Sequence, residues 1–97
     1  MNTTADVISV LIDGITDIDK MIRFASDAVN AGKEIEHEWF NRHIVERYRI
    51  AVEDYEWILR NTSIRKDIDA DDAIAISMDK FIRLKLDEFE RRIEKIK

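Results

Sequence analysis

The sequence contains no cysteine, which excludes disulfide bonds, thiolate metal ligands and a cysteine nucleophile. This absence is compatible with a reducing compartment. The first residues lack the basic segment and apolar run of a secretory signal, and no apolar run approaches the roughly 20 residues of a membrane span. We therefore expect a cytoplasmic protein with no membrane among its partners.

Proline is also absent, and glycine occurs only twice, at positions 14 and 32. The turns of a β-sheet need these residues far more often than the connections between long helices do. Two isolated glycines also cannot form a phosphate-binding glycine loop. The composition therefore predicts an all-α fold, and a chain of 97 residues predicts a single domain over 1–97.

An excess of basic residues is missing as well. The chain has 16 lysines and arginines against 21 aspartates and glutamates, which gives a formal net charge of −5. Proteins that bind nucleic acids need a positive surface to neutralise the phosphates. We therefore do not expect a nucleic acid partner for this acidic protein.

Apolar residues at helical spacing predict three helices, over about 5–30, 34–60 and 70–96, with residues 61–68 as a connection. In the first helix, apolar residues alternate spacings of three and four through three heptads, which is typical of a coiled-coil seam. These residues are Ile8, Leu11, Ile15, Ile18, Ile22, Ala25 and Val29. Three further residues and a glycine widen this face beyond what a two-stranded coil needs: Val7, Gly14, Met21 and Ala28.

The second and third helices also carry broad apolar faces that predict a shared core. The face of the second helix consists of Phe40, Ile44, Val45, Tyr48, Ala51, Val52, Tyr55, Ile58 and Leu59. The face of the third consists of Ile74, Met78, Phe81, Ile82, Leu86, Phe89, Ile93 and Ile96.

Capping residues mark the predicted ends of these helices. Thr3 with Asp6 is typical of a helix start, and Gly32 is typical of a helix stop. Asp69 is predicted to cap the third helix, with Asp72 at its third position. Because the break around Gly32 is short, the first two helices are predicted to be antiparallel neighbours.

The second helix carries another apolar stripe on the side away from its core face. Trp39, His43, Ile50 and Trp57 fall within about 40° of one another at 100° per residue. Tryptophan is enriched in the hot spots of protein interfaces, and monomers seldom expose such a patch. We interpret the stripe as a docking surface for a second copy or for a protein partner. The alternatives are that the third helix covers it or that it lines a small-ligand pocket.

Arginines flank this stripe and supply the small-ligand alternative. Arg42, Arg47 and Arg60 could bind a nucleotide or another anion, because an arginine beside a tryptophan offers both charge and stacking. Acidic residues are interleaved with these arginines, which favours a solvated face of ion pairs over a ligand site.

Two sequence patterns suggest metal binding, and both are incomplete. Glu34 and His37 match half of a di-iron ExxH pattern, but no second ExxH is present. The segment 67–72 begins like a calcium-binding EF-hand loop, yet lacks the glycine and the glutamate that such a loop requires. An enzyme with a metal at Glu34, His37 and Glu38 is therefore the weakest alternative. We expect no catalytic residues, no metal and no cofactor.

The sequence thus predicts an antiparallel helical hairpin plus a third long helix, resembling a three-helix bundle, in a homo-oligomer that is a dimer or larger. The predicted function is that of a non-enzymatic helical protein. It would self-associate and bind or modulate another macromolecule, as a regulator, adaptor or inhibitor.

Overall fold

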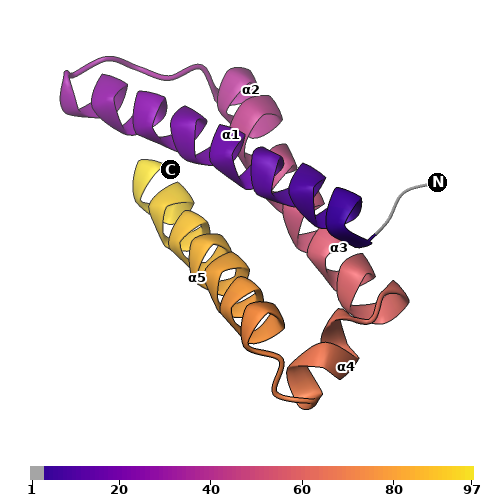
Figure 1. The fold of residues 1–97 in the computed structure, drawn as a ribbon. Coiled ribbons are helices and arrows are strands. Elements are labelled where there is room, and N and C mark those ends of the chain that lie inside the picture. The colour runs from indigo at the N-terminus through magenta and orange to yellow at the C-terminus, as the bar shows by residue number, and fades with distance from the viewer. Residues whose placement is uncertain (1–3) are drawn as a thin grey trace.

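The computed structural model describes the chain from residue 4 to residue 97, and all regular structure in that range is helical (Figure 1). The elements are α1 (Thr4–Asn30), α2 (His37–Phe40), the π-helical segment η1 (Asn41–Val45), α3 (Glu46–Asn61), α4 (Ile64–Asp69) and α5 (Ala73–Ile96). The predicted all-α class is confirmed. None of these helices is long and apolar enough to cross a membrane.

Helix α1 forms because its seam provides one long apolar edge that can be buried. The seam residues from Ile8 to Ala25 are buried as predicted, and Ile22 and Ala25 have no exposed surface. Val29, at the end of the seam, is 44 % exposed because it lies beside an open hollow at the end of the helix. The prediction of a continuous seam is therefore wrong in the last turn.

The end of α1 is a Schellman motif. Gly32 has a φ of 77°, its N–H donates to the Val29 carbonyl at 3.0 Å, and the Lys33 N–H donates to the Ala28 carbonyl at 2.9 Å. Glycine adopts this left-handed conformation without the steric cost of a Cβ atom. The predicted stop at Gly32 is confirmed. The predicted capping pair at the start includes Thr3, which lies outside the described residues.

The second predicted helix starts later than expected and is not uniform. Residues 33–36 are not helical, so the helix begins at His37 and not at Glu34. From there to Asn61 the chain is helical throughout, but η1 inserts a π turn between α2 and α3. A π turn has i→i+5 hydrogen bonds and holds more residues than an α turn. The predicted core face of the second helix is largely confirmed, with Phe40, Ile44, Ala51, Tyr55 and Ile58 buried.

The third predicted helix begins at Ala73, and the predicted connection before it contains α4. Asp72, not Asp69, is the N-cap, and its carboxylate accepts a hydrogen bond from the Ala75 N–H at 2.9 Å. Ile74 is 80 % and Phe81 is 45 % exposed, so their assignment to the core is wrong. The cause is that the first turn of α5 presents Ala75 to the core in place of Ile74.

The three long helical segments pack on one another, with α3 running opposite to α1 and α5 (Figure 1). The molecule is elongated, with extents of 49 × 26 × 16 Å. The largest fully buried side chains come from all three segments: Ile15, Ile18, Ile22, Ile44, Ile58, Ile82 and Phe89. Helix α4 lies at the end where α3 leads into α5 (Figure 1).

Candidate interaction surface

The first half of the predicted stripe lies against α1. The ring of Trp39 is 5.6 Å from that of Phe24 and 5.2 Å from that of His43, and both stripe residues are half-buried. Trp39 thus borders the same helix, α1, that Trp57 borders through Val7 and Val10. The Nδ1 atom of His43 is buried and makes no hydrogen bond.

The second half of the stripe remains on the outer surface. Ile50 and Trp57 are each 48 % exposed, beside Val10 of α1, which is 68 % exposed. These residues border two hollows between α1 and α3. One of about 140 Å³ is lined by Gly14 and Ile50, and one of about 180 Å³ by Val7 and Trp57. We call this surface the α1/α3 face. It consists of Val7, Val10, Gly14, Asp17 and Phe24 of α1 and Arg47, Ile50, Asp54 and Trp57 of α3.

Three charged side chains on the α1/α3 face have no ionic partner. Asp17, Arg47 and Asp54 line the same hollow, yet none of them forms an ion pair with any residue from 6 to 97. The neighbouring Arg49 differs, because it binds Glu46 at 2.6 Å and Glu53 at 2.9 Å. The face therefore combines exposed apolar groups with charges of both signs that are available to a partner.

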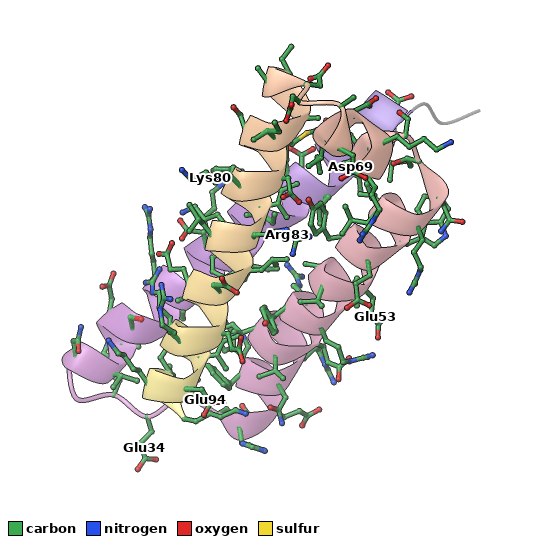
Figure 2. The ribbon with its side chains drawn as sticks, turned by 90° about the horizontal axis from the view of Figure 1, so that it is seen from below. Glu34, Glu53, Asp69, Lys80, Arg83 and Glu94 are labelled. Carbon is green, nitrogen blue, oxygen red and sulfur yellow. The ribbon has the colours of Figure 1, made fainter. Side chains whose placement is uncertain are left out.

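Helix α5 packs on a different side of α3 and does not cover this face. It contacts α3 through Tyr55, whose hydroxyl donates a hydrogen bond to the Asp79 carboxylate. Arg83 donates to the same carboxylate at 2.9 and 3.1 Å, and Figure 2 shows it on the side of α5 that faces α3. Ile50 and Trp57 stay exposed, so the third helix is not the explanation for the stripe.

The three arginines of the small-ligand alternative are not gathered in one place. Arg42 lines a hollow with Trp39 and His43, where its guanidinium binds the Glu38 carboxylate at 2.8 Å. Arg47 lines the separate hollow between α1 and α3, and Arg60 lines neither. The arrangement therefore offers an anion no cluster of two or more unpaired arginines among these three.

Two residues of the metal alternative, Glu34 and His37, border one hollow, but they do not form a metal site. Glu34 precedes α2 and points away from the helices (Figure 2), while the His37 ring is hydrogen-bonded to Asn41 at 3.0 Å. Glu38 is engaged by Arg42. Between residues 4 and 97, no three histidines or carboxylates lie close enough to hold a metal ion. Asp72 of the calcium-like segment caps α5.

The sequence patterns pointed to the α3 side of the face but missed much of its α1 side. The spacing places Val7 and Gly14 in the widened seam and gives no role to Val10 or Phe24. The available signal is that Val10 and Phe24 are large apolar residues of α1 outside its seam. Their neighbours could not be identified without knowing which turns of the first two helices lie side by side.

Comparison of the chain with protein-family models, with curated proteins and with solved structures finds no match.

Proposed function

We propose that this protein is a non-enzymatic helical interaction protein that self-associates through the α1/α3 face. The observation that carries this proposal is the exposure of Val10, Phe24, Ile50 and Trp57 outside a core that is already complete. Apolar groups gathered on one face of a soluble protein are typical of a binding surface. The assembly would bind or modulate another macromolecule as a regulator, adaptor or inhibitor.

A second copy of the chain is the occupant that the charges of this face favour. The face carries an unpaired arginine, Arg47, and two unpaired aspartates, Asp17 and Asp54. In a symmetric dimer each surface meets a copy of itself, so a face with both signs of charge can satisfy its own charges twice. A surface of one sign would repel its own copy.

The dimensions of the face set the expected strength of the dimer. From Val7 to Phe24 it is about 25 Å long at 1.5 Å per residue, and two helix diameters make it about 20 Å wide. An area of about 500 Å² per copy is similar to that of the smaller specific interfaces. We therefore expect a dimer that dissociates on dilution.

The mass in solution tests this proposal directly. Light scattering and sedimentation over a range of concentrations should show a dimer for the wild type. The double variant Ile50→Glu/Trp57→Glu should be a folded monomer, because it places four carboxylates in the dimer interface without touching the core. A wild type that stays monomeric at high concentration would contradict the proposal.

A matched control comes from α5. The double variant Phe81→Glu/Leu84→Glu changes two apolar side chains of similar exposure, 45 % and 57 %, on a helix outside the α1/α3 face. It should retain the wild-type mass at every concentration. If this control also dissociated the dimer, the contact surface would lie on α5 or the effect would be one of general charge.

A further inference from the structure

We infer that the dimer is a four-helix contact in which α1 of each copy lies on α3 of its partner, with the two-fold axis parallel to these helices. This inference rests on the proposed self-association and specifies how the partner is seated. The two-fold axis relates the contact of α1 with the partner's α3 to the contact of α3 with the partner's α1, so each residue contact occurs twice.

The shared hollows indicate which residues of α1 and α3 lie at the same height along the helix axes. Gly14 and Asp17 of α1 line one hollow with Ile50 and Arg47 of α3, and Val7 lines the other with Trp57. Because α1 and α3 run in opposite directions (Figure 1) and these four residues line one hollow, we infer that Gly14 is level with Ile50, and Asp17 with Arg47. A two-fold axis parallel to the helices preserves these levels across the interface.

The size of the side chains fits this arrangement. Ile50 of one copy faces Gly14 of the partner subunit, which is a large residue opposite the smallest one. A Cβ atom at Gly14 would meet nothing within 4 Å in its own chain, so there is space on this face for the side chain of another molecule. Glycine inside a helix is less favourable than alanine, and packing within the chain does not require it here. At the next hollow, Trp57 faces the partner's Val7.

The charges fit as well. Arg47 of one copy is level with Asp17 of the partner subunit, and both are exposed and unpaired in the single chain. The symmetry produces this ion pair twice. Charged residues at such positions fix the register of helix pairs more than they add affinity.

The competing arrangement has its two-fold axis perpendicular to the helices and is less favourable. It would place α1 on α1 and α3 on α3, each antiparallel. The outer side of α1 carries the exposed residues Asp13 and Asp17, so two copies of this acidic surface would meet. Arg47 would then face the partner's Asp54 in place of Asp17, and this difference separates the two arrangements experimentally.

The test uses single charge reversals alone and in mixtures, with the dimer measured by sedimentation and native mass spectrometry. Arg47→Asp alone and Asp17→Arg alone each bring like charges together twice, so each should raise the dimer Kd at least tenfold. Mixing the two variants should restore a heterodimer with a Kd within about threefold of that of the wild type, because both interchain pairs again have opposite signs. Circular dichroism of each variant verifies that it is folded.

Mixing also separates contacts between chains from contacts within a chain. In each single variant, positions 17 and 47 of the same chain carry like charges, and mixing does not change this. A loss of dimer caused by repulsion within one subunit would therefore not be rescued by the other variant. Rescue by the mixture of Arg47→Asp with Asp54→Arg, and not by the mixture with Asp17→Arg, would overturn the inferred arrangement in favour of the perpendicular axis.

Two further outcomes distinguish failure of the inference from failure of the proposed function. If the wild type is a dimer that Ile50→Glu/Trp57→Glu dissociates, but the single reversals remain dimeric, Arg47 and Asp17 do not meet and only the inferred arrangement fails. If the wild type is a monomer, the proposed function itself fails, and the arrangement fails with it.

Discussion

Asp71 adopts a backbone conformation that its residue type does not favour. Its φ of 60° lies in the left-handed region, and it ends α4 as Gly32 ends α1. The Asp72 N–H donates to the Asp67 carbonyl at 2.9 Å, and the Asp71 N–H donates to the Ile68 carbonyl at 3.0 Å. Aspartate tolerates this region better than most residues but still carries a steric cost that glycine avoids.

We expect Asp71→Gly to stabilise the protein. Relief of the left-handed strain exceeds the added freedom of glycine in the unfolded chain, and the net gain should be about 0.5 kcal/mol. For a chain of this size, thermal denaturation should show a rise in Tm of about 2–4 °C. Gly32→Ala is the matched control at the equivalent position of α1, and it should lower the Tm. A lower Tm for Asp71→Gly would show that the aspartate side chain stabilises this turn.

Among the helices, the sequence predicts what depends on spacing within one helix. The buried seam residues of α1 from Ile8 to Ala25, and the core face of α3, follow from a period of 3.6 residues. Which of two nearby polar residues caps a helix is harder to predict from the sequence. Asp69 and Asp72 are equally suitable caps by residue type, but Asp69 is the last residue of α4, and the turn at Asp71 leaves Asp72 as the cap of α5.

The neighbours of the stripe on α1 are the feature that the sequence could not predict. A period of 3.6 residues places Trp39 on the same face as Trp57, and in the structure Trp39 lies beside Phe24 and Trp57 beside Val7. No residue type in Asn41–Val45 marks the π turn that the structure shows there. Phe40 and Ile44 are four residues apart and both are buried, as on one face of an ordinary α-helix.

The contact between α3 and α5 depends on a polar group in a half-buried position. Tyr55 donates its hydroxyl hydrogen to the Asp79 carboxylate, and the Arg83 guanidinium lies 5.7 Å from the centre of the Tyr55 ring. Burial is the main cause that raises the pKa of the Tyr55 hydroxyl, and the hydrogen bond to Asp79 adds to it. The neutral form of this tyrosine is therefore the one that the folded state favours.

We expect Tyr55→Phe to lower the free energy of unfolding by about 1.5 kcal/mol, because one hydrogen bond to a charged group is lost. Asp79 keeps its contact with Arg83, so no carboxylate is left without a partner. Chemical denaturation of the variant measures this loss. Tyr48→Phe is the control, since the Tyr48 hydroxyl makes no hydrogen bond within the described residues, and it should change stability by much less.

Removal of the Tyr55 hydroxyl should also change how stability depends on pH. A tyrosine whose pKa is raised in the folded state binds its proton more tightly when folded than when unfolded. Its contribution to stability is complete below the unfolded pKa of about 10 and is lost as the pH rises above that value. The wild type should therefore lose more stability above about pH 10 than Tyr55→Phe does. Equal slopes for the two proteins would contradict the assigned role of Tyr55.

At the scale of the whole molecule, the chain is small, so association with a second copy would contribute appreciably to its stability. A domain of this length buries only about 60–70 % of the surface of its unfolded chain, which leaves a small margin of stability. Apolar groups on the α1/α3 face remain in contact with water in the single chain, although they are as large as those in the core. Burial of this face by a second copy would add to a stability that is otherwise limited by size.

Mass action therefore predicts that the Tm of the wild type rises with protein concentration. While the dimer is the main folded species, each tenfold increase stabilises a chain by about 0.7 kcal/mol, which corresponds to a rise in Tm of about 3 °C or more. Differential scanning fluorimetry or calorimetry over a hundredfold range of concentration measures this slope. Ile50→Glu/Trp57→Glu should show a Tm that does not change with concentration, because its unfolding involves one chain. A flat response of the wild type over the same range would mean that the folded protein is a monomer, and the α1/α3 face would then need another occupant.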